Sequence, residues 1–172
     1  MFKNGNCLFM SMGVIIVTGS VGTGKTTISK KLAKKLNLHY IDVNKIITKY
    51  NISEGYDKKR KTKIIDIKKL NKVLIREINN FKKIKKEIII DSHLSHYFPK
   101  KYADLCLVTK CNLKVLEKRL KKRRYSKTKI RENLDAEIFD VCLNEAKENG
   151  HKVIVINTTK GITGLNSINR FI

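Results

Sequence analysis

Several features are scarce in this 172-residue chain, and each scarcity excludes a class of protein. A single proline and the absence of any low-complexity stretch leave no visible linker at which a second domain would begin. No apolar run approaches the roughly 20 residues that a membrane-spanning helix needs. The four cysteines form no C-x-x-C pair and have no histidine at ligand spacing, which disfavours a zinc site or a disulfide framework.

Acidic residues are also few. The chain has 15 Asp and Glu against 38 Lys and Arg, a formal net charge of +23. The excess is mostly lysine and is spread over nearly every segment, so it reflects either overall composition or a positive field that attracts polyanions such as RNA. With 41% hydrophobic residues the chain otherwise has the composition of one folded globular domain.

One stretch of the sequence matches a motif with a defined chemistry. Residues 19–26 match G-x-x-x-x-G-K-[ST] at every fixed position, after an apolar run that predicts a buried strand and before apolar residues at helical spacing. A glycine-rich turn between strand and helix aims backbone N–H groups at one point, where the helix dipole adds positive potential. We therefore expect a nucleoside triphosphate site in which Lys25 reaches the β- and γ-phosphates and Thr26 joins the Mg²⁺ shell.

The N-terminal residues 1–11 are expected to be a dispensable extension, with Met12 as the functional start of one domain over 12–172. The apolar stretch that begins at Cys7 faintly resembles a signal sequence, but it runs directly into the strand that supports the glycine-rich turn. Cleavage there would destroy the site. A cytoplasmic protein is therefore expected.

Strand-like and helical patterns alternate along the whole chain. Strands are expected at 14–18, 39–43, 87–91, 104–109 and 152–157, and helices at 25–36, 44–50, 67–81, 113–122, 128–149 and 164–170. This order predicts an α/β fold with a parallel five-stranded sheet and helices on both faces. Two connections at the carboxyl ends of strands, 51–66 and 121–130, are where a ligand is expected in such a sheet.

A second group of residues has the chemistry of phosphoryl transfer. Asp91 ends an apolar strand, as a Walker B carboxylate would, and is expected to hold Mg²⁺ directly or through water. His93, two residues later, either orients a phosphate or an attacking water, or is an ordinary hydrogen-bonded loop histidine. Four of the seven arginines fall within 119–131, and their planar donors suit phosphoryl oxygens. Of these, Arg119 and Arg123 share a helix face and are the stronger candidates for function.

Taken together, these residues resemble the adenylate-kinase-related ATPases of the CINAP type, archaeal and eukaryotic factors of small ribosomal subunit maturation. The resemblance covers 13–159. It includes the glycine-rich turn, the Asp91-x-His93 pair, the Glu-Gly-Tyr-Asp of 54–57, the Arg-rich 119–126 and, most specifically, the Glu-Asn-Leu-Asp-Ala-Glu-Ile of 132–138.

The resemblance implies a three-layer P-loop NTPase fold of the nucleoside monophosphate kinase type. It also implies a monophosphate-binding segment at 42–65 and a lid at 121–131. By position, the contacts to ATP fall on Gly19, Gly22, Gly24, Lys25, Thr26, Thr27, the lid arginine Arg123 and, near the adenine, Lys160. The chain departs from the family in two places. Arg124 stands where relatives usually have glycine, and Thr48, followed by Lys49, stands where they often have arginine.

Three functions remain open at this point. The first is an adenylate kinase that moves the γ-phosphoryl group of ATP onto AMP and also hydrolyses ATP. The second is a ribosome-assembly switch whose kinase reaction is vestigial. In that role the resemblance implies a partner, the small-subunit platform protein equivalent to bacterial protein eleven, and contact with ribosomal RNA. The third is a kinase for another small acceptor, such as cytidylate or shikimate.

Overall fold

The computed structural model describes residues 13–58 and 62–161. The expected extension at 1–11 and the expected helix at 164–170 lie outside these residues. The helices and strands, in chain order, are β1 (Val14–Thr18), α1 (Lys25–Leu36), β2 (His39–Asp42), α2 (Val43–Lys49), β3 (Ser53–Asp57), β4 (Thr62–Ile65), α3 (Ile67–Lys83), β5 (Ile88–Asp91), β6 (Leu105–Lys110), α4 (Leu113–Lys122), α5 (Lys127–Ile138), α6 (Val141–Glu148) and β7 (Val153–Asn157).

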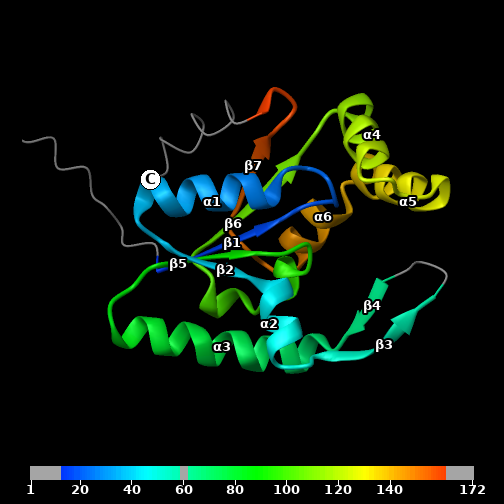
Figure 1. The fold of residues 1–172 in the computed structure, drawn as a ribbon. Helices are drawn as coiled ribbons and strands as arrows, with labels where there is room; N and C mark the ends of the chain where they lie inside the picture. The colour runs from blue at the N-terminus through cyan, green and yellow to red at the C-terminus, as the bar shows by residue number, and fades with distance from the viewer. Residues whose placement is uncertain (1–12, 59–61, 162–172) are drawn as a thin grey trace, which may run out of the picture.

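Five strands form one parallel sheet in the order β2-β5-β1-β6-β7 (Figure 1). Helix α1 covers one face, and α2, α3 and α6 pack on the other. The expected α/β sheet with helices on both faces is therefore confirmed. The carboxyl ends of β1 and β5 lie side by side, because Val17 is in register with Asp91.

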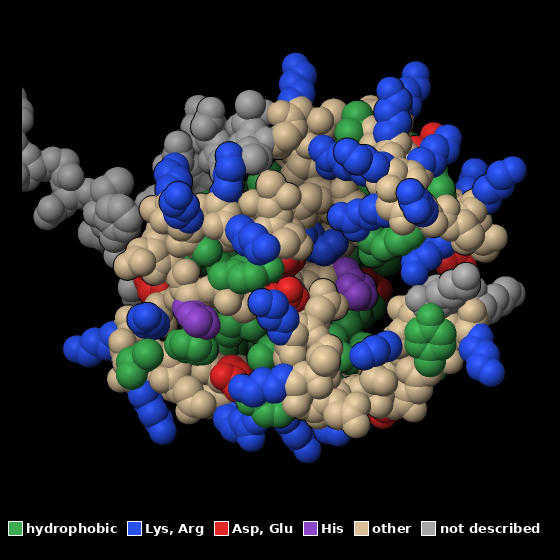
Figure 2. Space-filling model, viewed as in Figure 1, with side chains coloured by type: hydrophobic (Ala, Val, Ile, Leu, Met, Phe, Trp, Pro, Cys, Tyr) green, Lys and Arg blue, Asp and Glu red, His purple; other side chains and the backbone are tan. Residues whose placement is uncertain are grey.

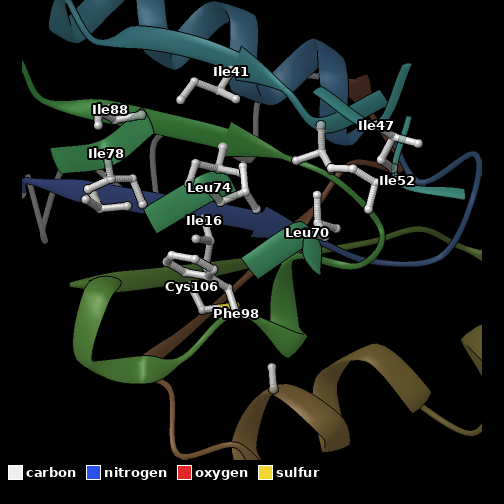
Figure 3. Packing of buried hydrophobic residues seen from close by; sticks show 14 of the residues in the cluster. Ile16, Ile41, Ile47, Ile52, Leu70, Leu74, Ile78, Ile88, Phe98 and Cys106 are labelled. Carbon is white, nitrogen blue, oxygen red and sulfur yellow. The ribbon is translucent and has the colours of Figure 1, made fainter. Parts of the chain in front are cut away.

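The core follows from the alternation of side chains along the central strand. Ile16 of β1 points into the cluster beneath α3 (Figure 3), and Val14 belongs to the same cluster. Ile15 and Val17 point to the other face, into the cluster beneath α1. All four are at most 1% exposed. A strand buried on both faces must be apolar at every position, which is why the run before the glycine-rich turn is continuous rather than alternating.

A third and smaller cluster joins α4 to α5. Leu116 and Leu120 of α4 pack with Ile130 of α5 and with Val21 of the glycine-rich turn. The α4–α5 pair thus rests directly on that turn and projects from the end of the sheet where the parallel strands finish (Figure 1).

One expectation about secondary structure is wrong, and one connection contains strands that were not expected. The helix expected over 128–149 is two helices, α5 and α6, separated at Asp140, which has a left-handed φ of 53°. Asp tolerates this conformation better than most residues, and the Asp140 carboxylate pairs with Lys110 across the break. The connection expected over 51–66 contains the antiparallel hairpin β3–β4. Its strands are short and largely exposed, so they lack the alternating pattern that marks a half-buried strand.

Candidate functional site

The glycine-rich turn, which we call the phosphate loop (Gly19–Gly24), connects β1 to α1 in a geometry that only glycine accommodates. Gly19 has φ 136°, and a Cβ there would lie 2.4 Å from the Thr109 carbonyl oxygen. Gly22 has φ 94°, and a Cβ there would lie 2.9 Å from Leu116. The loop therefore packs against β6 at its start and against α4 in its middle.

Lys25, at the start of α1, lies over the phosphate loop. Its Nζ donates to the carbonyl oxygens of Gly19, at 2.8 Å, and Ser20, at 2.9 Å. Burial lowers the pKa of Lys25 to about 8, and the nearby carboxylates of Asp91 and Glu137 act against that shift. A partly buried ammonium over a turn of backbone amides has the chemistry to bind an anion.

Two oxygen donors meet beside Lys25. The Asp91 carboxylate, at the end of β5, is 4% exposed and accepts a hydrogen bond of 2.9 Å from the Tyr40 hydroxyl. That hydroxyl also hydrogen-bonds to the Thr26 side chain on the first turn of α1. Burial and the bond to Asp91 raise the pKa of Tyr40, so its proton stays in place. Tyr40 thus joins the two side chains that the sequence predicted as Mg²⁺ ligands, and the sequence analysis missed it.

His93 follows Asp91 on an exposed turn. The surrounding protein, and after it the positive charge of Lys25, lowers the pKa of His93 well below its usual value, so the imidazole is neutral at neutral pH. The buried side chain of His96, which is 2% exposed, supports this turn. His96 has its Nδ1 2.7 Å from the Thr18 hydroxyl and its Nε2 2.8 Å from the Glu145 carboxylate. No sequence pattern indicated His96, because its partners come from β1 and α6.

Arg119 and Arg123 line a cavity of about 520 Å³ with residues of the phosphate loop and the start of α1, namely Gly22, Gly24 and Thr27. The Arg119 guanidinium donates to the Thr158 carbonyl oxygen at 2.8 Å and to its hydroxyl at 3.2 Å. Arg119 therefore braces the loop after β7 against the phosphate loop. Arg123, at the end of α4, is exposed at the cavity edge.

Lys160 does not line this cavity. It is exposed and borders a separate groove with Asn112 and Asn157. The structure thus brings together the loop glycines, Lys25, Thr26, Asp91 and the two arginines, and it leaves Lys160 apart. Figure 2 shows a hollow between the β3–β4 hairpin and the α4–α5 pair, with Lys and Arg side chains along its rim.

Arg124, beside the cavity, has a left-handed φ of 57° and is exposed. That conformation costs an L-residue roughly 1–2 kcal/mol and costs glycine almost nothing, while glycine adds roughly 0.5–1 kcal/mol of backbone entropy to the unfolded chain. We expect Arg124→Gly to raise the free energy of unfolding slightly, by about 0.5 kcal/mol. Urea denaturation measures this change in the free energy of unfolding. Lys118→Gly, at an exposed position in the interior of α4, is the matched control and should lower stability by about 1 kcal/mol; equal losses in both variants would contradict the strain at Arg124.

Across the part of the chain that the structure describes, no three His, Cys, Asp or Glu side chains gather in a way that could hold a metal ion. Within the same residues, every helix is too short or too polar to cross a bilayer.

Comparisons with known proteins show the family of this chain. The family model described as "AAA domain" matches residues 15–140. A "Putative adenylate kinase" of Methanocaldococcus jannaschii is 39% identical over 145 residues, which cover 84% of this chain and 76% of the relative. An "Adenylate kinase isoenzyme 6 homolog" of Caenorhabditis elegans is 35% identical over 141 residues, covering 82% and 76%.

Solved structures are similar in fold at lower identity. A shikimate kinase from Acinetobacter baumannii superposes with a TM-score of 0.60 and 15% identity, covering 95% of this chain and 92% of that one. A sugar kinase from Janibacter superposes with a TM-score of 0.59 and 18% identity, covering 92% of this chain and 91% of that one. These neighbours show a P-loop kinase fold. The matched family model and the relatives above 30% identity show that the chain belongs to the AAA domain family and, within it, to the putative adenylate kinases of archaea and their isoenzyme 6 homologues in eukaryotes.

Proposed function

We propose that this protein is an adenylate kinase that transfers the γ-phosphoryl group of ATP to AMP, forming two molecules of ADP. The observation that carries the proposal is the convergence of Lys25, the Thr26–Tyr40–Asp91 chain and the arginine-lined cavity at one end of the sheet. Phosphoryl transfer needs little covalent help from the protein, so positioned donors and charges of this kind suffice. The names and identities of the relatives support the same choice.

Mg²⁺ fits the donors at this site. The Thr26 hydroxyl and the Asp91 carboxylate are hard oxygen ligands, and Tyr40 holds both side chains in place. When bound, the metal would neutralise charge on the phosphates of ATP. Lys25 would bind the β- and γ-phosphates, with the N–H groups around Gly22 and Gly24. Arg123 would close over the transferring group.

The domain organisation that we propose is a single kinase domain over 12–172, with an acceptor segment at 42–65 and a lid at 121–131. The acceptor segment contains α2 and the β3–β4 hairpin. In α2 the Thr48 hydroxyl donates to the Asn44 carbonyl oxygen at 3.0 Å, and Lys49 lies 5.0 Å over the Tyr50 ring. Lys49, as the cation, is the better choice to grip the AMP phosphate.

A coupled assay of the purified protein tests the proposal. ATP is supplied alone and then with each nucleoside monophosphate, with shikimate as a further acceptor. We expect ADP formation to rise most with AMP and to persist at a lower rate with ATP alone. A faster rate with cytidylate or shikimate, or no response to any acceptor, would contradict the adenylate kinase assignment.

His93 is proposed to position either the acceptor or an attacking water. We expect His93→Ala to lower kcat by about tenfold or more with little change in ATP affinity, because only an interaction made in the transition state is lost. Steady-state kinetics and calorimetric ATP binding measure the two effects. His39→Ala is the control. His39 begins β2, at the end of the sheet away from the site, so kcat and ATP affinity should stay unchanged. Unchanged kcat in His93→Ala would make His93 an ordinary loop histidine.

A second proposed function is an ATP-dependent role in maturation of the small ribosomal subunit, in the cytoplasm. A net charge of +23 favours contact with ribosomal RNA. Two large apolar side chains at the end of α5, Ile138 at 51% and Phe139 at 69% exposure, favour a protein partner at that surface. The proposed partner is the platform protein equivalent to bacterial protein eleven.

If that partner is correct, ATP should change its affinity, and the partner should change ATP affinity by the same factor. A factor of about 5–150 is typical of such coupling. Titration of the labelled platform protein, with and without ATP, measures it; Phe139→Ser should weaken the complex without weakening ATP binding. If no complex forms either with or without ATP, this second function is contradicted and only the kinase proposal stands.

A further inference from the structure

A buried carboxylate lies directly behind the phosphate loop. Glu137, in the last turn of α5, is 6% exposed. Its Oε2 accepts a hydrogen bond of 2.7 Å from the Ser20 hydroxyl, and its Oε1 accepts one of 2.8 Å from the Cys111 backbone N–H. Both oxygens are therefore occupied by groups from two different loops, one after β1 and one after β6.

A carboxylate in this place is costly. Burying a charge loses its hydration, and only strong hydrogen bonds offset the loss. A negative charge behind an anion site also works against phosphate binding, so its presence is not explained by general attraction for the ligand. Besides supporting the positive charge of Lys25, Glu137 contributes two hydrogen bonds of fixed length and direction.

Those hydrogen bonds hold the part of the phosphate loop that is proposed to bind the phosphates of ATP. The Ser20 carbonyl oxygen accepts from Lys25 Nζ at 2.9 Å and from the Thr23 hydroxyl at 2.7 Å. Ser20 thus holds both the lysine and the turn of the loop. The other oxygen of Glu137 fixes Cys111, which leads into α4, and α4 contacts Gly22 through Leu116.

We propose that Glu137 is a positioning residue that fixes the phosphate loop against the C-terminal end of α5, in the orientation that binds the phosphates of ATP. The inference rests on the proposed use of this loop for ATP. Because α5 begins in the segment proposed as the lid, the same contact joins the lid helix to the loop. Glu137 touches no reacting atom, and it acts through Ser20 and Cys111.

Removal of the carboxylate tests this role. Glu137→Ala should raise the Kd and the KM for ATP by about tenfold or more, since a buried hydrogen-bond acceptor of two donors is lost. The KM for AMP should change by less than about twofold. A purely structural role predicts another result, a smaller fraction of folded molecules with lower kcat and unchanged KM for both nucleotides.

Two further variants keep the test decisive if Glu137→Ala folds poorly. Glu137→Gln retains an acceptor for the Cys111 N–H and a donor for the Ser20 oxygen, so it should bind ATP within about threefold of wild type. Ser20→Ala removes only the bond to the loop and should raise the Kd for ATP by about threefold to tenfold. In the Glu137→Ala background, Ser20→Ala should raise the Kd for ATP hardly any further, because both changes remove the same Ser20–Glu137 contact.

Calorimetric titration with ATP, alongside steady-state kinetics with AMP, gives the readouts. Glu132→Ala, an exposed carboxylate on the same helix, is the matched control and should be neutral. Wild-type affinity in Ser20→Ala and Glu137→Ala would overturn the positioning role, as would a Glu137→Gln protein as impaired as the alanine variant. A wild-type protein that binds ATP but does not phosphorylate AMP would contradict only the adenylate kinase proposal. A wild-type protein that does not bind ATP would overturn both.

Discussion

Lys25→Ala should abolish measurable phosphoryl transfer and ATP hydrolysis together, with a loss on the order of 10²–10³ in kcat or more. The reason is that the Lys25 Nζ lies over Gly19 and Ser20 of the phosphate loop, where the β- and γ-phosphates are proposed to bind. The fold should not suffer. Burial lowers the pKa of Lys25 to about 8, so the folded state disfavours this ammonium, and its removal relieves that cost at neutral pH.

The measurement is a coupled ADP assay, with and without AMP, on protein shown to be folded by thermal denaturation. Lys31→Ala, exposed on the same helix, is the control that removes one positive charge from α1 without touching the loop. A folded Lys25→Ala protein with wild-type turnover would overturn the assignment of the phosphate loop.

Arg123→Lys is expected to have the second largest effect, a fall of tenfold or more in AMP-dependent turnover. Arginines that stabilise charge on a transferring phosphoryl group contribute about 10³–10⁵ in rate in related reactions. Lysine keeps the charge but loses the planar fork that can donate two parallel hydrogen bonds to phosphoryl oxygens. The exposed position of Arg123 at the edge of the cavity leaves its side chain free to move toward a bound nucleotide.

The neighbouring residue is the natural comparison. Arg124 is also exposed, but its left-handed backbone suits glycine, so Arg124→Gly should keep wild-type turnover or exceed it slightly through a freer lid. Rates at saturating ATP and AMP measure both variants. A silent Arg123→Lys combined with an inactive Arg124→Gly would show that the functional arginine is the other one.

The sequence by itself determined the sheet and the phosphate loop. Both depend on residues that are neighbours in the chain: apolar runs of three or four residues for the central parallel strands, and glycines next to Lys25 for the loop. Local patterns of this kind carry their own geometry, because strand burial and the tight turn restrict which residue types fit. The strand and helix limits expected from the sequence for these elements lie within two residues of those observed.

Only the tertiary structure decided how the site is held together. Tyr40 reaches Asp91 across 51 residues of sequence, and Ser20 reaches Glu137 across 117. The break at Asp140 that ends α5 just after Glu137 is spanned by a contact with Lys110, 30 residues away. No local pattern specifies such pairs, because each side chain finds its partner only after the sheet order β2-β5-β1-β6-β7 has brought distant strand ends to one edge.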